Sequence, residues 1–311
     1  MTVSINILNY NTYEKSCICI DSCLKQKGID FQILLIDNAS TDDSFEKLKL
    51  KYGDAIHYLQ TGKNYGFAGG NNKGVEYCLQ NNIRYAFLLN SDTELIGITL
   101  LSELINIIKN YPDCAIVSPT IYDITKSGYI IHTNDYLYNK LLRLIGILPS
   151  IYSISDNIKL TSEAHGSALL VDCKRFISAG GFPEHYFMYC EESTLSKKML
   201  WNDTKIYWYI NKQICVYHHH DKTQTIAPWR EFLMGRNRAI EYYENKRSHS
   251  KLWYFVYRFF QFKMFFRSLK TNNTHFYHGM KEGEKLIKHN SSHLDIYFNG
   301  LKMSQTYMQN Q

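Results

Sequence analysis

In the segment LLNSDTEL (residues 88–95), an apolar run, YAFLL (85–89), ends abruptly in polar residues. Asn90, Ser91 and Asp92 are common turn residues, so an ordinary turn explains the pattern as well as a reactive site does. Open α/β sheets, however, bind their ligands at the carboxyl ends of their strands. The segment alone leaves both interpretations open, and the rest of the chain has to decide between them.

Apolar, strand-like segments alternate with helix-like segments through the first half of the chain, which is typical of βαβ units. Four strands are predicted, at residues 3–10, 31–37, 57–61 and 84–89. Polar residues follow each of them, and the four residues of interest are Asn9, Asp37, Asn64 and Asp92. Four such strand ends in succession favour a ligand-binding cleft over four unrelated turns.

The segment NYGFAGGNNKGVEYCLQNN (64–82) is expected to form a loop, with glycines at positions 66, 69, 70 and 74, that runs into a helix. It lacks the G-x-G-x-x-G spacing of a dinucleotide-binding loop and the lysine of a P-loop, which disfavours a dehydrogenase and an NTPase. Its glycines would let the backbone approach a flat or phosphorylated ligand closely, with Asn71 and Asn72 as hydrogen-bonding groups.

The composition is that of a globular protein of 311 residues, with 45% hydrophobic and 21% charged residues. A net charge of +6 is too mild to imply a nucleic-acid partner. The eight cysteines include no Cys-x-x-Cys pair, so we expect reduced structural thiols and no metal site among them. A strand-like run begins at residue 3, so no signal peptide is predicted, and a cytoplasmic location is expected.

The segment from residue 229 to residue 270 is helical in pattern, aromatic and basic. Its longest aromatic stretch, residues 252–266, is interrupted by Arg258 and Lys263, which argues against a membrane-spanning helix. Two interpretations remain. The helices either pack on the preceding domain, or they contact an anionic membrane surface with their aromatic and basic residues.

Six segments resemble glycosyltransferase family 2, the inverting enzymes of the GT-A fold, and within it the rhamnosyltransferase-like branch of bacterial polysaccharide synthesis. They are VSINILNYN (3–11), LIDNASTDDS (35–44), NYGFAGGNNKG (64–74), LLNSDTEL (88–95), GGFPEHYFMYCEESTLSKKM (180–199) and VYHHH (216–220). The resemblance implies a Rossmann-like α/β domain, with a mostly parallel central sheet flanked by helices, at residues 1–225. A C-terminal helical region, residues 226–311, would contact the membrane or the acceptor.

The resemblance also implies a nucleotide-sugar site in which Asp37 contacts the base. The residues it assigns to this site are Asn9, Asn11, Asp37, Asn38, Asn64, Gly66, Asn71, Asn90 and Arg236. Asn90 stands where relatives carry the first acid of an Asp-x-Asp-type motif, so Asp92 is the expected metal ligand. His218 matches a position that completes the coordination. A hard cation, Mg²⁺ or Mn²⁺, would neutralise the leaving nucleoside diphosphate.

Glu191 and Glu192 form an acidic pair at a predicted helix start, where two acids can simply complement the helix dipole. In the resembling family, the second acid of this pair takes the proton from the acceptor hydroxyl. That residue is Glu192 here, with Glu191 as the alternative base. Relatives usually carry Glu-Asp, and Thr194 replaces a frequent third acid.

The resemblance thus predicts an inverting, metal-dependent hexosyltransferase, with dTDP-rhamnose as the first candidate donor. The acceptor would be a lipid-linked or growing surface glycan at the cytoplasmic face of a bacterial plasma membrane. A UDP-hexose donor and a catalytically degenerate, glycan-binding scaffold protein are the alternatives. A sugar nucleotidyltransferase is disfavoured, because residues 9–12 supply neither glycine nor a cation for a triphosphate. The acceptor linkage and the oligomeric state stay open.

Overall fold

The computed structural model describes residues 3–125, 128–131, 137–219, 227–244 and 251–289. The chain forms two compact units. Unit 1 comprises Met1–Asn134, Ser150–Phe182 and Leu195–Gln224, and unit 2 comprises Asp135–Pro149, Pro183–Thr194 and Thr225–Gln311. Parts of the predicted C-terminal region (226, 245–250 and 290–311) and His220 of the histidine run lie outside the described residues. The domain boundary at residue 225 stays a prediction.

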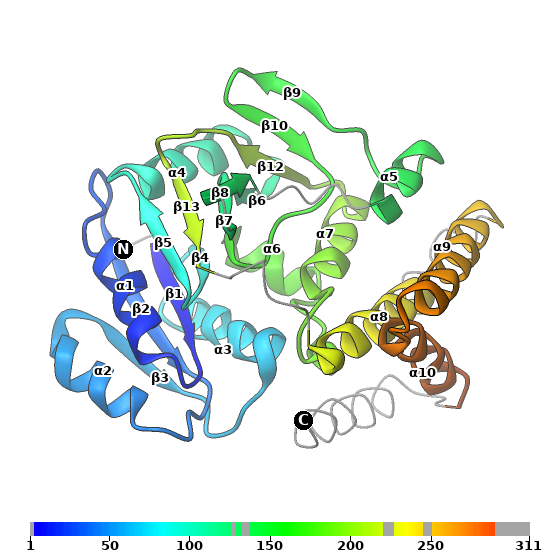
Figure 1. Cartoon of the computed structure of the whole chain (residues 1–311). Coiled ribbons are helices and arrows are strands. Elements are labelled where there is room, and N and C mark those ends of the chain that lie inside the picture. Colours follow the sequence, from blue (N-terminus) through cyan, green and yellow to red (C-terminus); the bar gives the residue numbers. More distant parts are fainter. Residues whose placement is uncertain (1–2, 126–127, 132–136, 220–226, 245–250, 290–311) are drawn as a thin grey trace. The chain divides into compact units, whose positions relative to one another are not determined.

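Unit 1 is built on a nine-stranded sheet in the order β3-β2-β1-β4-β11-β6-β12-β10-β9 (Figure 1). The strands are β1 Val3–Asn9, β2 Phe31–Asp37, β3 His57–Gln60, β4 Tyr85–Asn90, β6 Cys114–Ser118, β9 Tyr152–Ser155, β10 Ile158–Thr161, β11 Ala168–Asp172 and β12 Lys205–Tyr209. Strands β3, β2, β1 and β4 are parallel, and β11 is antiparallel to both of its neighbours. The expected α/β fold with a parallel strand core is therefore confirmed.

Both faces of this sheet are covered, which explains the uninterrupted apolar run in β4. Tyr85, Phe87 and Leu89 join a core with α1, α2 and α4, whereas Ala86 and Leu88 join a second core with α3, α6 and part of α7. A strand buried on both faces has no solvent side and needs no polar alternation. The helices are α1 Tyr13–Cys23, α2 Ser44–Tyr52, α3 Gly66–Gln80, α4 Leu100–Asn110, α6 Cys173–Ser178 and α7 Glu191–Trp201, with a short 3-10 helix, η1 Gly53–Ala55.

A second, four-stranded sheet of unit 1 has the order β5-β13-β7-β8. Its strands are β5 Thr93–Ile96, β13 Cys215–His218, β7 Ile121–Thr125 and β8 Gly128–Ile131. The chain leaves the large sheet at the end of β4, turns through two residues and enters β5. Strand β13 lies between β5 and β7, so that His218 pairs with Thr93 on one side and with Asp123 on the other.

The glycine-rich segment is mostly helical, so the predicted loop over residues 64–74 is wrong in its extent. Helix α3 already begins at Gly66. A Cβ at Gly70 would lie 2.5 Å from Leu8 Cδ1, and one at Gly74 would lie 2.4 Å from Ile36 Cδ1. These two glycines therefore let α3 pack closely on β1 and β2, which gives them a structural role independent of any ligand.

Unit 2 is helical. Its elements are α5 Leu137–Leu144, η2 Glu184–Tyr186, α8 Pro228–Glu244, α9 Lys251–Thr271 and α10 His275–His289. Helices α8 and α10 pack backbone against backbone at Gly235 and Gly279. A Cβ at either glycine would lie 2.0 Å from a carbonyl oxygen of the facing helix, that of Phe276 or of Phe232. The helical C-terminal region expected from the sequence is present in the described residues.

Replacing Gly279 by Ala should destabilise the protein by about 2–3 kcal/mol, because the added methyl group forces two packed helices apart. In an open helix the same change would stabilise by about 0.5–1 kcal/mol, so the sign of the effect tests the packing. Denaturant unfolding measures the difference. Lys285→Ala, at an exposed position on the same helix, serves as the control and should change the stability by less than about 0.5 kcal/mol. A stabilised Gly279→Ala variant would contradict the close α8–α10 contact.

All eight cysteines are free and buried, as expected of structural thiols. No helix in the described ranges combines the length and the apolar character needed to cross a bilayer.

Candidate functional site

The turn between β4 and β5 carries Asp92 out of the large sheet and into the small one. Ser91 and Asp92 are its two turn residues. Thr93 Oγ1 donates a hydrogen bond of 2.7 Å to the Asn90 carbonyl, and Thr12 Oγ1 lies 2.9 Å from Ser91 Oγ. These bonds fix the turn and leave the Asp92 carboxylate partly exposed. The acidic residue at this strand end is thus held in place by its neighbours.

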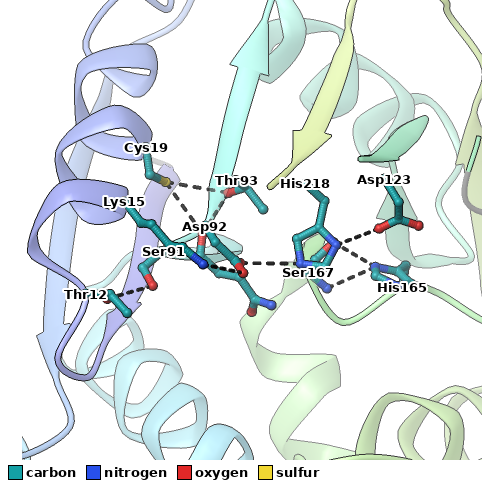
Figure 2. Close-up of polar contacts among 11 residues, drawn as sticks. Thr12, Lys15, Cys19, Ser91, Asp92, Thr93, Asp123, His165, Ser167 and His218 are labelled. Carbon is teal, nitrogen blue, oxygen red and sulfur yellow. Dashed lines mark hydrogen bonds and ion pairs between the residues drawn. The ribbon is translucent and has the colours of Figure 1, made fainter. Parts of the chain in front are cut away.

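His218 lies between two carboxylates, those of Asp92 and Asp123 (Figure 2). Its Nδ1 donates to Asp123 Oδ1 at 2.8 Å, and its Nε2 lies 3.4 Å from Asp92 Oδ1. The pairing of β13 with β7 and β5 brings these residues together from distant parts of the chain. Asp123 was not predicted from the sequence. The sequence did contain a clue. Strand alternation puts Asp123 on the same buried face as Ile121, and a buried carboxylate needs a partner.

The electrostatic environment of His218 favours positive charge. Burial lowers the pKa of its imidazole, but the hydrogen bonds and the charges of Asp123 and Asp92 outweigh this effect and raise the pKa to about 9. Asp123 is completely buried, so its carboxylate needs a cationic or hydrogen-bonding partner. Without a metal, the imidazole therefore holds a proton near neutral pH, and it would have to release this proton in order to bind a cation.

The donor set fits a hard divalent cation. A carboxylate oxygen and an imidazole nitrogen 3.4 Å apart have about the spacing of two adjacent ligands of one metal ion. Asp123 would hold the His218 ring with its Nε2 directed at the metal, which is the usual arrangement around a metal-bound histidine. Within the described part of the chain, no group of three or more His, Cys, Asp or Glu side chains converges to hold a metal. The remaining ligands would have to come from the substrate or from water.

Further polar side chains lie near Asp92 and His218 (Figure 2). Lys15 Nζ lies 3.9 Å from Asp92 Oδ2 and brings a positive charge to the turn. The rings of His165 and His218 are 5.8 Å apart, and His165 Nδ1 accepts from the backbone N–H of Ser167 at 3.2 Å. Lys15 and Ser167 were not singled out from the sequence, since neither lies in a distinctive motif.

Asp37 ends β2 inside a hydrogen-bond network that also explains Asn9. The Asp37 carboxylate is buried and accepts from Asn9 Nδ2 at 3.0 Å and from Ser40 Oγ at 2.6 Å. Asn9 Oδ1 in turn accepts from Thr12 and Ser16, at 2.9 Å and 2.8 Å. The Asn9 side chain is fully buried, and its contacts hold Asp37 and the loop that follows Asn9.

Three more predicted nucleotide-site residues hold neighbouring loops. The exposed Asn11 accepts through Oδ1 from the backbone N–H of Thr41 at 2.8 Å. The buried Asn38 donates through Nδ2 to Asn64 Oδ1 at 3.0 Å and to the Gly66 carbonyl at 2.9 Å. Asn38, Asn64 and Gly66 thus tie the end of β2 to the start of α3.

Asn71 and Asn90 differ from these residues, because each has a side-chain polar group that could still bond to a ligand. Asn71 is buried on α3 and donates through Nδ2 to the Phe67 carbonyl at 3.0 Å. Its Oδ1 has no hydrogen-bond partner among the described residues, which is costly unless a ligand or water supplies one. Asn90 bonds through its backbone, since its N–H donates to the Ser167 carbonyl at 3.0 Å, and its side chain is partly exposed beside Asp92.

Glu191 and Glu192 begin α7 and belong to unit 2. Glu191 is buried, and burial together with the neighbouring Glu192 charge raises the pKa of its carboxyl well above the ordinary value. Glu191 Oε2 has no hydrogen-bond partner within the described ranges. Glu192 is only half-buried. The two adjacent acids therefore have different environments, because Glu191 is enclosed and favours the protonated form, whereas Glu192 is partly exposed.

The loop before this pair has a strained backbone. Phe187, Tyr189 and Cys190 all have positive φ, at 66°, 74° and 71°, which non-glycine residues rarely adopt. At Phe187 the chain makes a γ-turn, in which the Met188 N–H donates to the Tyr186 carbonyl at 2.8 Å. Backbone strain of this kind persists only where the surroundings enforce it.

The side chains of Arg236 and Asn237, on α8, hold this strained loop in place. Asn237 Nδ2 lies 2.8–3.1 Å from the carbonyl oxygens of Tyr186, Met188 and Tyr189. Arg236 Nη2 donates to the Tyr186 carbonyl at 2.8 Å. Both side chains are fully buried, and burial lowers the pKa of Arg236 to about 10. In this structure Arg236 contacts backbone carbonyls and positions the loop before Glu191, and its predicted phosphate contact stays a prediction.

The sequence model of the family described as Glycosyl transferase family 2 matches residues 4–169, more than half of the chain. The matched stretch contains Asp37, the turn with Asp92, and Asp123. The chain belongs to glycosyltransferase family 2.

Relatives and solved structures agree with family 2. Over 191 residues the chain is 31% identical to the low-salt glycan biosynthesis hexosyltransferase Agl10 of Haloferax volcanii, an overlap of 61% of this chain and 59% of Agl10. The chain thus spans less than two thirds of the length of that relative.

The solved structure of TarS 1-349 from S. aureus in complex with UDP matches with a TM-score of 0.52 and 15% identity, over 78% of this chain and 65% of TarS 1-349. GalNAc-T7 with UDP, GalNAc and Mn²⁺ matches with a TM-score of 0.55 and 13% identity, over 77% and 51% of the two chains. At these identities the likeness concerns the fold alone, and it confirms the GT-A fold expected for this family 2 chain.

The buried acid of the family 2 chain gives a pH prediction for stability. The folded pKa of Glu191 is raised, so the folded state holds a proton that the unfolded state releases above about pH 4.3. Glu191 therefore lowers stability as the pH rises from there toward its folded pKa, by at most about 1.4 kcal/mol per pH unit.

Glu191→Gln should match the wild type near pH 4 and be the more stable protein near pH 8. Urea unfolding at several pH values measures the difference. Glu46→Gln, at an exposed site on α2, is the control. Parallel pH curves for wild type and Glu191→Gln would contradict the raised pKa.

Proposed function

We propose that this protein transfers a hexose from a nucleoside-diphosphate sugar to a hydroxyl of a glycan acceptor, with inversion at the sugar carbon and with the help of Mg²⁺ or Mn²⁺. The observation that carries the proposal is the Asp92–His218–Asp123 arrangement at the end of a parallel strand in a family 2 chain. A glycan acceptor and hexosyl transfer accord with the likeness to Agl10, a glycan biosynthesis hexosyltransferase.

The residues that would hold the metal are Asp92 and His218, with Asp123 fixing the imidazole. A divalent cation bound there supplies neutralisation of the negative charge that develops on the leaving diphosphate. Lys15, 3.9 Å from Asp92, adds a positive side chain beside the same turn. GalNAc-T7, a structural neighbour, was solved with Mn²⁺, which supports the choice of cation.

The nucleoside would be bound by the loops that end β1 and β2. Asp37 accepts the hydrogen bonds of the base. The surrounding loops are kept in place by four side chains, those of Asn9, Asn11, Asn38 and Asn64. The unpartnered Oδ1 of Asn71 and the partly exposed amide of Asn90 are further hydrogen-bonding groups for the donor. Gly66 adds its backbone at the start of α3.

Glu192 acts as the base. It takes the proton from the acceptor hydroxyl while that oxygen bonds to the sugar carbon, and the bond from this carbon to the diphosphate oxygen breaks. The diphosphate leaves with the electron pair from the opposite side of the ring, which inverts the configuration. Glu192 suits this role better than Glu191, because a base must be ionised and accessible, and Glu191 is buried with a raised pKa.

Arg236 and Asn237 are positioning residues in this mechanism. They hold the carbonyls of residues 186–189, and helix α7 with its two acids starts directly after that loop. A strained loop fixed by two buried side chains would keep the Glu192 carboxylate in one orientation.

The donor is either dTDP-rhamnose, as the sequence resemblance implies, or a UDP-hexose, since TarS and GalNAc-T7 were solved with UDP. The acceptor is a lipid-linked or growing surface glycan, reached at the cytoplasmic face of the plasma membrane.

Calorimetric binding of a panel of UDP-, dTDP- and GDP-linked sugars, with Mn²⁺ and with a chelator, tests the proposal. Metal-dependent binding of one donor class is expected, and transfer to a glycan acceptor should then follow from the same donor. If no sugar nucleotide binds in either condition, the donor site is wrong, and the catalytically degenerate scaffold protein becomes the better account.

Asp123→Asn should weaken Mn²⁺-dependent donor binding about tenfold, because the amide no longer fixes and polarises the His218 ring. The control is Glu94→Gln, which makes the same change beside the neighbouring His219. Titration calorimetry in the presence of Mn²⁺ compares the two variants. Equal donor affinity in wild type and Asp123→Asn would remove His218 from the metal site.

A further inference from the structure

Helix α9 has two apolar faces. The face that packs within unit 2 carries Trp253, Tyr257, Gln261, Met264 and Ser268, all buried. At about 100° per residue, a second set of residues lies on the opposite side of the helix. These are Leu252, Phe255, Phe259, Phe262, Phe266 and Leu269, each between 51% and 65% exposed. We call this second set the aromatic stripe.

The aromatic stripe is unusual for an exposed surface. Its residues follow one another at intervals of three and four, so they form one continuous band along the helix. Phe262 and Phe266 are in contact, with ring centroids 4.5 Å apart. Singly exposed apolar residues need no explanation, but a contiguous band of four phenylalanines and two leucines indicates a surface that meets a partner.

Charge distinguishes the partners that could cover this band. Helix α9 contains five basic residues and no acidic one. By helical geometry, Lys251 and Arg258 lie along one side of the aromatic stripe, and Lys263, Arg267 and Lys270 lie along the other. All five are exposed.

Two of these cations also contact acids of unit 2. Arg258 reaches Glu284 at 3.5 Å and Arg267 reaches Glu231 at 3.1 Å, while all three lysines flank the stripe as exposed charges.

A second copy of α9 does not complement this surface. Two stripes packed together would bring the six lysines of two helices into one interface, and α9 itself has no acidic residue to pair with them. An anionic lipid bilayer complements both the apolar band and the positive charges beside it. Aromatic rings insert at headgroup depth, and the flanking lysines meet the lipid phosphates. A helix that lies in the membrane surface does not need to cross it, and α9 is not a spanning helix.

We propose that the aromatic stripe of α9 docks the protein on an anionic membrane surface, with the phenylalanines inserted at headgroup depth and with Lys251, Lys263 and Lys270 on lipid phosphates. The proposal concerns lipid contact and does not depend on which sugar the protein transfers.

Vesicle flotation of the full chain tests this inference. Vesicles of phosphatidylethanolamine and phosphatidylglycerol should carry the wild type upward, and vesicles of phosphatidylcholine alone should not. A triple variant, Phe255→Ser, Phe259→Ser and Phe262→Ser, should lower the partition coefficient at least about a hundredfold. Lys251→Gln, Lys263→Gln and Lys270→Gln should each lower it about fivefold, and added salt should weaken binding further.

The matched control changes three exposed leucines outside α9, namely Leu24→Ser, Leu50→Ser and Leu144→Ser. This control should float like the wild type. Circular dichroism and sugar-nucleotide binding show that each variant is folded, so a failure of docking is distinguishable from a failure of the proposed activity.

The inference is overturned if the wild type stays unbound on anionic vesicles, or if the control and the phenylalanine variant lose binding equally. It is also overturned if sedimentation shows a dimer that the phenylalanine variant loses, which would assign the stripe to a second copy.

Discussion

Replacing Glu192 by Gln is expected to lower kcat for hexosyl transfer by about a thousandfold, while the affinity for the donor stays unchanged. The amide keeps the size of the side chain but cannot take the proton from the acceptor hydroxyl. Glu192 is half-buried, so the change should leave the fold intact. Initial rates at saturating donor and acceptor, together with a donor Kd, separate loss of chemistry from loss of binding.

Glu191→Gln is the matched comparison, because it makes the same change one residue earlier. Glu191 is buried with a raised pKa, so its amide variant resembles its protonated form and should keep most of the activity. If Glu191→Gln loses activity and Glu192→Gln keeps it, the base is Glu191. If both variants remain as active as the wild type, neither acid is the base and the mechanism is wrong.

Asp92→Ala is expected to weaken metal-dependent donor binding at least about a hundredfold. The substitution removes one of the two side chains that would hold the cation, and His218 with Asp123 remains alone. Titration of the bound sugar nucleotide with and without Mn²⁺ measures the effect, and the difference between the two conditions should nearly vanish in the variant.

Glu94→Ala is the control for this experiment, since Glu94 follows two residues later on β5 and contacts His219 instead. It should bind donor like the wild type. An Asp92→Ala variant that still responds to Mn²⁺ would place the cation elsewhere in the protein.

Most of the fold could be predicted from local sequence patterns. The four strands of the first half are all present, because each is an apolar run bounded by turn residues, and such runs depend little on distant context. Residues 64–74 were the exception. Their glycines suggest a loop by propensity, but close packing of α3 on β1 and β2 requires glycine inside the helix.

The candidate site was predictable in part. Asp92 follows a strand end, which sequence shows directly, and the family resemblance supplied His218. Asp123 could not be placed, because its proximity to His218 depends on the pairing of β7 with β13 across a wide sequence separation. The family resemblance supplied Arg236 as a phosphate contact, and that assignment stays a prediction. The burial of Arg236 among backbone carbonyls follows from the tertiary packing of unit 2.

The two-faced character of α9 has a consequence for how this helix finds its place during folding. Apolar burial alone hardly distinguishes the two sides of α9. If the helix turned by half a turn about its axis, four phenylalanines would face the core instead. Polar contacts on the packed side can make the choice, because Tyr257 and Gln261 hydrogen-bond to Glu284 of α10, at 3.1 Å and 2.9 Å. Glu284 is buried, so the rotated helix would leave its carboxylate without these donors. One acidic side chain thereby selects which face of α9 is left outside.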